Sequence, residues 1–170
     1  MATNFLLKLD GAGIKGESPV DGYSDYIQLI SMRFGGTQTG TFGTGGGGGG
    51  GKFSADDLEV SMYTNKATPK MIEACANGSH IKTGTLVALK AGGGKAVEYL
   101  KVTLSDVVIS KHSIGYEPPP PGSKGADLVV DNFSLDYAKI AVEYKEQKKD
   151  GSQGPGVEGG FDLTKHKTGK

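Results

Sequence analysis

The chain has 170 residues, and its 19 Lys and Arg residues balance its 19 Asp and Glu residues to a formal net charge of zero. A balanced charge gives no general affinity for nucleic acid or for an anionic membrane surface, so we expect neither as a partner. The single cysteine, Cys75, excludes an intramolecular disulfide. At this length the simplest organisation is one domain, spanning residues 1–170, whose hydrophobic core needs no covalent staple.

The N-terminal segment, residues 1–8, has neither the basic start nor the long apolar run of a secretory signal peptide. No apolar run elsewhere approaches the length of a membrane span, so we expect no membrane insertion. These features predict a cytoplasmic protein, exported only by a route that does not read such a signal.

The apolar-rich segments of residues 4–9 and 26–34 predict the first two strands. Successive side chains of a strand point to opposite faces, so one face of the second strand should be buried and the other exposed. We expect Ile30, Met32 and Phe34 on the buried face, and Ser31 and Arg33 on the other.

Residues 35–51 are rich in glycine and end in seven consecutive glycines, beginning at Gly45. Such a tract has a high entropic cost to order and offers no side chains to bury. We therefore expect an extended loop that orders only against something outside its own fold. The strand pattern resumes over residues 52–63, where Leu58, Val60 and Met62 alternate with polar residues.

The one convincing helix follows, over about nine residues. Thr68 is predicted to cap its start, and Pro69 to occupy the first helical position, where a missing N–H costs nothing. Gly78, which tolerates a left-handed backbone, is predicted to end it. So short a helix cannot stand alone in water and should pack on the flank of a β domain. The residues predicted on its packed face are Met71, Ile72 and Cys75.

The second half of the chain continues as strands. Residues 83–90 and 97–104 predict a hairpin across a glycine-rich turn, and a further strand begins at residue 106. Residues 128–144 form the longest β pattern. Its apolar phase slips by one residue, which predicts a bulge at Ala138–Lys139.

The chain is predicted to end with a polar, glycine-rich loop over residues 145–160 and a short strand at residues 161–163. About eight strands with one helix indicate a mainly β fold, either a β-barrel or a β-sandwich.

Several features resemble catalytic or metal sites but lack the required context. Gly11–Gly16 matches the GxGxxG pattern of dinucleotide-binding proteins, yet a turn follows where a helix is needed. Gly46–Lys52 resembles a phosphate-binding loop, yet Phe53 stands where Ser or Thr is required. The three histidines lie far apart, without Cys or Glu at ligand spacing. We expect no catalytic residue, no metal, no cofactor, and a protein that is not an enzyme.

Residues 66–80, Lys-Ala-Thr-Pro-Lys-Met-Ile-Glu-Ala-Cys-Ala-Asn-Gly-Ser-His, are similar to the Lys-Ser-Thr-Pro-x-Leu-x-x-Ala-Cys-x-x-Gly-x-His stretch of the Hcp family. These proteins are the hemolysin-coregulated tube subunits of type VI secretion systems. Residues 14–18, 31–35, 98–100 and 133–140 resemble the same family, so the likeness extends over nearly the whole chain.

The resemblance implies a compact β-barrel of two sheets with one short flanking α-helix, assembled as a homohexameric ring. Rings would stack into a tube inside a contractile sheath, tipped by a VgrG-type spike, and hold small effector proteins in the lumen. The export route would be the type VI apparatus. Alternatives are a phage-like tail-tube protein and an effector-chaperone ring that does not stack.

The resemblance also assigns roles to individual residues. Ser31 and Arg33 match positions that face the lumen, and the glycine-rich loop matches a segment that contacts neighbouring subunits and stacked rings. The residues predicted to make these loop contacts are Phe42, Gly45, Gly46, Gly47, Gly48, Gly49, Gly50, Gly51, Lys52 and Phe53.

Overall fold

A computed structural model of the chain describes residues 4–40, 51–92, 95–118, 128–148 and 151–169. Within these ranges it contains one helix and eleven strands. They are β1 (Asn4–Asp10), β2 (Ile27–Leu29), β3 (Ser31–Arg33), β4 (Gly36–Gln38), β5 (Phe53–Ala55), β6 (Leu58–Tyr63), α1 (Thr68–Asn77), β7 (Ile81–Gly92), β8 (Lys95–Glu117), β9 (Leu128–Gln147), β10 (Gln153–Asp162) and β11 (Lys167–Thr168).

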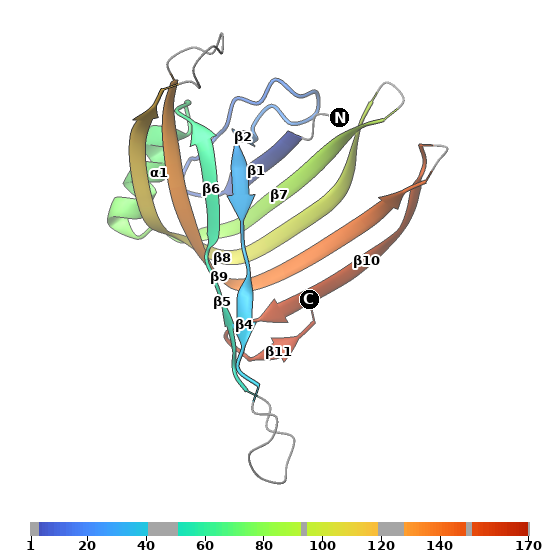
Figure 1. The fold of residues 1–170 in the computed structure, drawn as a ribbon. Coiled ribbons are helices and arrows are strands. Elements are labelled where there is room, and N and C mark those ends of the chain that lie inside the picture. Colours follow the sequence, from blue (N-terminus) through green and yellow to red (C-terminus); the bar gives the residue numbers. More distant parts are fainter. Residues whose placement is uncertain (1–3, 41–50, 93–94, 119–127, 149–150, 170) are drawn as a thin grey trace.

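The strands form two antiparallel sheets, as expected for a mainly β protein. The large sheet has the order β11-β10-β9-β8-β7-β1-β2, and β4 and β5 form a separate two-stranded sheet. The large sheet branches at β9, because β6 pairs with residues 130–135 of β9 and β10 pairs with residues 139–147. Figure 1 shows β8 and β9 bending as they pass from one branch to the other.

The expected barrel is not closed in the part of the chain that the structure describes. β2 pairs with β1, whereas β3 pairs with β6. The predicted strand 26–34 is therefore two strands, separated at Ile30. Ile30 was expected on the buried face, but it is 45% exposed, because the chain leaves one partner strand for another at this residue.

The apolar phase does slip near Ala138, but the predicted bulge there is not observed. Tyr137 and Ile140 both pack on the core, and in the facing strand Leu104 and Val107 do the same. The alternation of buried and exposed side chains shifts at the same point in β8 and in β9. The pairing register between the two strands is therefore unchanged there. Asp106, with φ of 52°, lies where β8 slips. The irregularity in the β8–β9 register occurs between Ile109 and Lys111.

Two further predictions about the strands were wrong. No new strand begins at residue 106, because β8 runs unbroken from Lys95 to Glu117. Residues 145–160 are not a loop: β9 extends to Gln147 and β10 returns along it from Gln153. The predicted short strand at 161–163 is the end of β10, which pairs with β11.

Helix α1 was predicted in the right place but with the wrong cap. Its N-cap is Ala67, without a side-chain cap, and Thr68 is the first helical residue. The helix ends as expected at Gly78, which has φ of 65° and donates its N–H to the Ala74 carbonyl. The buried residues are Thr68, Met71 and Ala74, so Ile72, at 37% exposed, was wrongly placed on the packed face, and Cys75 is partly buried.

The main core lies between the two branches of the sheet and α1. It joins apolar side chains from β1, β2, β6, β7, β8, β9 and the helix, including Leu7, Ile27, Leu58, Met71, Leu86, Leu104 and Phe133. A smaller cluster on the other face of β1 and β7 packs Leu6, Val87 and Leu89 under Val20, Tyr23 and Tyr26. The loop over residues 11–26 thus covers this face. No helix follows the Gly11–Gly16 motif in this loop.

Candidate functional site

Strands β3, β6, β9 and β8 lie side by side and present one polar face. Their register aligns two rows of side chains across all four strands, and residues directly opposite each other share a face. One row is neutral and consists of Ser31, Ser61, Asn132 and Ser113. The other is charged and consists of Arg33, Glu59, Ser134 and Lys111. The opposite face of the same strands is the core, and Ser31 and Arg33 are exposed as predicted.

A hollow of about 320 Å³ crosses this polar face and is lined by both rows. In the described part of the chain, neither Arg33 nor Lys111 forms an ion pair, although Glu59 lies directly opposite Arg33 in the register. A larger polar hollow of about 880 Å³ continues from Arg33 towards Asp56 and Asp57. The face therefore offers hydrogen-bonding groups and charges of both signs to whatever contacts it.

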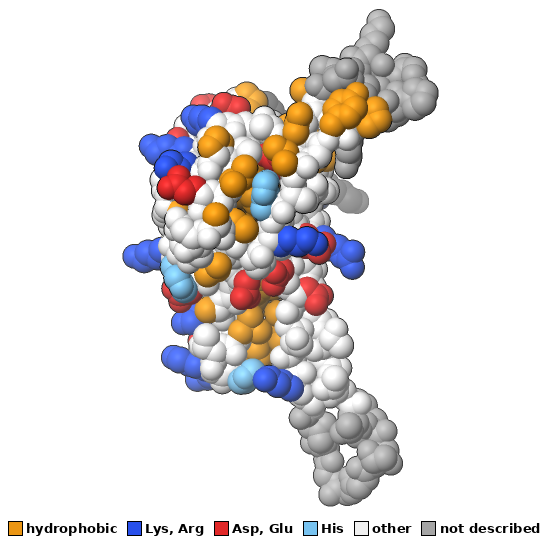
Figure 2. All heavy atoms as spheres, turned by 90° about the vertical axis from the view of Figure 1, so that its left-hand side faces the viewer, with side chains coloured by type: hydrophobic (Ala, Val, Ile, Leu, Met, Phe, Trp, Pro, Cys, Tyr) orange, Lys and Arg blue, Asp and Glu red, His pale blue; other side chains and the backbone are white. Residues whose placement is uncertain are grey.

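Both edges of this four-stranded part are open among the described strands. β3 pairs only with β6, and the segment of β8 from Val108 to Ile114 pairs only with β9. Unpaired backbone N–H and C=O groups on such an edge can accept a further strand. The open edge of β8 lies beside α1 on the left of Figure 1. Figure 2, which faces that side, shows a broken band of hydrophobic side chains among charges of both signs.

The segment predicted as an extended loop begins and ends as a two-stranded arm. β4 pairs with β5, and in Figure 1 both strands run to the end of the molecule at which β11 lies. Phe53 does not reach outwards: its ring packs edge-on against Phe161 of β10, at 4.9 Å between centroids. Gly51 lies so close to the Thr39 carbonyl that any Cβ would collide with it. Phe42 and Gly45–Gly50 lie outside the described residues, and Lys52 is exposed on the arm.

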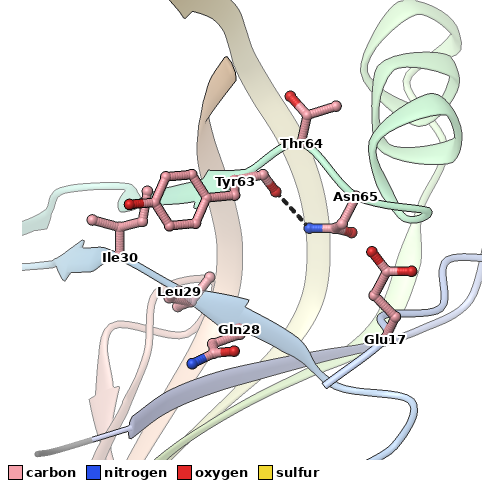
Figure 3. Close-up of a pocket in the computed structure, with 7 residues that line it drawn as sticks. All are labelled: Glu17, Gln28, Leu29, Ile30, Tyr63, Thr64 and Asn65. Carbon is pink, nitrogen blue, oxygen red and sulfur yellow. Dashed lines mark hydrogen bonds between the residues drawn. The ribbon is translucent and has the colours of Figure 1, made fainter. Parts of the chain in front are cut away.

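A pocket of about 450 Å³ lies where β2 and β6 diverge (Figure 3). Ile30 and Tyr63 stand beside each other at one end of it, and Glu17 and Asn65 lie at the other. The remaining lining residues are Gln28, Leu29 and Thr64. Asn65 is held in place, because its side-chain amide donates to the Tyr63 carbonyl at 2.8 Å and its oxygen accepts the Ala67 N–H at 2.9 Å.

This pocket was not predicted from the sequence. Its residues come from three separate segments, and only the sheet topology brings them together. Glu59 and Lys111 were also missed, although their positions on polar phases of two predicted strands could have placed them beside Arg33 once the strand order was known.

One carboxylate has a clearly shifted pKa, although it lies outside the polar face. Asp162 accepts a hydrogen bond from the Thr164 hydroxyl, as well as the backbone N–H of Lys165, and pairs with Lys139 at 3.4 Å. These contacts, with the Thr164 bond the largest, lower its pKa from 3.8 to about 2. They fix the turn between β10 and β11.

In the described residues, no group of three or more His, Cys, Asp or Glu side chains is arranged to hold a metal.

Comparison with known proteins identifies the family. The family described as "Type VI secretion system effector, Hcp" matches residues 6–144, which is most of the chain. This chain belongs to the Hcp family. Protein hcp1 of Pseudomonas aeruginosa is 35% identical to it over 156 residues, covering 92% of this chain and 91% of that protein.

Solved structures agree with the Hcp assignment. The crystal structure of Hcp1 from Salmonella typhimurium has a TM-score of 0.74 and 27% identity, covering 99% of both chains. A structure described as a type six secretion system protein has a TM-score of 0.86 at 22% identity, covering 99% of this chain and 100% of that one, and so shares the fold. The part of this Hcp chain that the structure describes holds no helix long and apolar enough to cross a membrane.

Proposed function

We propose that this Hcp chain is a structural subunit that assembles with itself into hexameric rings, which stack as the tube of a type VI secretion apparatus. The observation that carries the proposal is the polar face of β3, β6, β9 and β8, which is backed by the core and open at both edges. A tube wall needs a continuous inner surface that tolerates water and moving cargo. A face of hydroxyl, amide and charged groups meets that need.

Ring closure follows from the difference between the two open edges. β3 at one edge and β8 at the other are not equivalent, so two copies joined edge to edge meet head to tail. Such heterologous contacts form a closed ring when each step turns by a fixed fraction of a circle. The neutral and charged rows would then run around the inside of the ring. Membership of the Hcp family supports six subunits.

The arm supports stacking, because β4 and β5 run to one end of the subunit, where a stacked ring would lie. We place Ser31 and Arg33 on the lumen wall, where they would contact small effector proteins held inside. The remaining partners in this proposal are a VgrG-type spike and a contractile sheath. The subunit acts by polymerising and enclosing cargo, not by catalysis, and leaves the cytoplasm through the apparatus.

The proposal is tested by the solution mass of the purified protein and by negative-stain images of the same fraction. We expect a six-subunit mass and annular particles. Ile114, which is 52% exposed at the open edge of β8, offers a variant: Ile114→Lys should reduce the mass to that of a monomer, and the matched Ile114→Leu should not. A wild-type protein that remains monomeric at high concentration would contradict the proposal. Rings that never form tubes would favour the chaperone alternative.

A further inference from the structure

The large sheet continues beyond the main core as a two-stranded extension of β9 and β10. The two strands stay paired here, from Val142 opposite Gly159 to Gln147 opposite Gln153. This extension is named the wing. Figure 1 shows it on the right, on the side of the molecule opposite α1.

The face of the wing that continues the core is apolar and uncovered. Tyr144 lies opposite both Leu100 and Val157 in the register, so the three side chains share this face. Leu100 packs against the main core, whereas Tyr144 is 46% exposed and Val157 is 69% exposed. A Cβ built on Gly159, the next residue on this face of β10, would meet no described atom within 4 Å. The core face therefore runs on into solvent and leaves room above it for side chains of another molecule.

A second apolar patch lies at the opposite end of β8 and β9. Tyr116 is opposite Val129 in the register, and two residues along the same face Ile114 is opposite Asp131. This face is on the α1 side, because the Asp131 carboxylate accepts a hydrogen bond from Thr68 in the first turn of the helix. The flank is the patch formed by the exposed side chains of Ile114, Tyr116 and Val129. It lies at the side of the molecule that Figure 2 faces.

The two patches suit each other better than they suit an unrelated partner. Each chain carries one wing and one flank, so copies of the chain present the two surfaces in equal numbers. Strand β3 has only three residues, and pairing through its edge would form few main-chain hydrogen bonds. Stable contacts between copies of a chain are centred on buried apolar side chains, and tyrosine is a frequent anchor among them. The wing and the flank supply such side chains.

We propose that the wing of one subunit covers the flank of the next copy of the chain, with Tyr144 and Val157 packed against Ile114. The patches lie on opposite sides of the molecule, so only a head-to-tail contact between copies can join them. The inference rests on the proposed ring, in which the open edge of β8 meets β3 of a neighbour. That edge lies beside the flank, and the wing lies on the side away from α1, so the step that joins the edges also brings a wing over the flank. Neighbours would then be held by paired strands at the lumen wall and by an apolar contact outside it.

The test joins cysteines placed in the two patches. Cys75→Ala removes the single native thiol, and Val157→Cys and Ile114→Cys are added to that chain. We expect a short bismaleimide to convert this variant into a ladder of covalent oligomers on a denaturing gel, and chains with either added cysteine alone to give no ladder. Glu158→Cys combined with Ile114→Cys is the matched control. Glu158 follows Val157 in β10 and faces the other side of the sheet, so this pair should also give no ladder.

A second measurement is the solution mass of single variants of the otherwise native chain. Val157→Lys should reduce the mass from that of a ring to that of a monomer, because the contact would bury an unpaired charge. Val157 is mostly exposed within one chain, so the substitution should leave the fold intact. Glu158→Lys should keep the mass of the native protein.

The inference is overturned if native rings form but the Val157–Ile114 pair gives no ladder, if the Glu158 control gives the same ladder, or if Val157→Lys keeps the native mass. A native protein that stays monomeric and gives no ladder overturns both the inference and the proposed ring. A specific ladder from a protein that forms no annular particles supports the contact between wing and flank and contradicts the closed ring.

Discussion

The hydroxyl of Thr68 donates a hydrogen bond to the carboxylate of Asp131, and both side chains are buried. The same carboxylate accepts the Thr64 hydroxyl at 3.1 Å, and the Thr68 hydroxyl accepts the Asn65 N–H at 3.1 Å. These bonds tie the start of α1 to β9. A residue predicted to cap its own helix instead joins the helix to the sheet.

Replacing Thr68 by Val should lower the free energy of unfolding by about 1–3 kcal/mol, because the substitution leaves a buried carboxylate with one donor fewer. Urea denaturation measures the effect. Lys70→Ala is the control: Lys70 lies on the same helix, but its ion pair with Glu73 is exposed and should be worth less than about 1 kcal/mol. Equal losses for the two variants would contradict the role given to the Thr68–Asp131 bond.

Replacing Gly78 by Ala should cost about 1 kcal/mol, because Gly78 adopts a left-handed backbone at the end of α1, with φ of 65° and ψ of 32°. A Cβ at this position meets nothing within 4 Å, so the cost is one of backbone strain alone. Gly78→Asn should cost less, since Asn tolerates this conformation better. The ranking Gly, then Asn, then Ala in thermal stability would support this account, and the reverse order of Asn and Ala would refute it.

The sequence predicted best where burial alone determines the pattern. Leu58, Val60 and Met62 alternate because β6 has one buried face, and all three are buried. The prediction from sequence failed where pairing with a neighbouring strand overrides the intrinsic strand propensity of the residues. Gly156, Gly159 and Gly160 weaken a strand on their own, yet they belong to β10 because β9 offers an edge along its whole second half.

The candidate site was less predictable than the fold. Ser31 and Arg33 could be placed on an exposed face from alternation, but their neighbours Glu59 and Lys111 depend on strand order. The split at Ile30 did leave a mark in the sequence, because the apolar alternation changes phase between Leu29 and Ile30. The change of partner strand at this point, however, depends on the sheet topology. Predicting the pocket where β2 and β6 diverge would have required the positions of Glu17 and Tyr63 relative to β2.

The low pKa of Asp162 predicts a stability difference that depends on pH. Because this pKa falls from 3.8 to about 2 on folding, the ionised carboxylate stabilises the native state above about pH 4. That contribution is lost as the pH falls through the folded pKa. Asp162→Asn should therefore have a lower urea midpoint than native protein at pH 6, and the difference should shrink between pH 4 and pH 2. A difference that is constant over this range would contradict the prediction. Asp10→Asn, at an exposed carboxylate, is the control.

At the base of the arm, the ring of Phe53 packs edge-on against that of Phe161. Phe53→Ala removes this aromatic contact, which is worth about 0.5–1.5 kcal/mol beyond the area it buries. Because β4 and β5 pair only with each other among the described strands, they depend on this contact for their orientation. We expect faster amide exchange in residues 36–38 and 53–55, and little change in β6, measured by hydrogen-exchange mass spectrometry. Phe53→Tyr, which keeps the ring, is the matched control.

The same variants separate the two levels of the proposed assembly. If the arm serves stacking and the open edges serve ring closure, Phe53→Ala should preserve the six-subunit mass and reduce the length of tubes in negative-stain images. Phe53→Tyr should leave both unchanged. Loss of the six-subunit mass in Phe53→Ala would show instead that the arm holds neighbouring subunits within one ring.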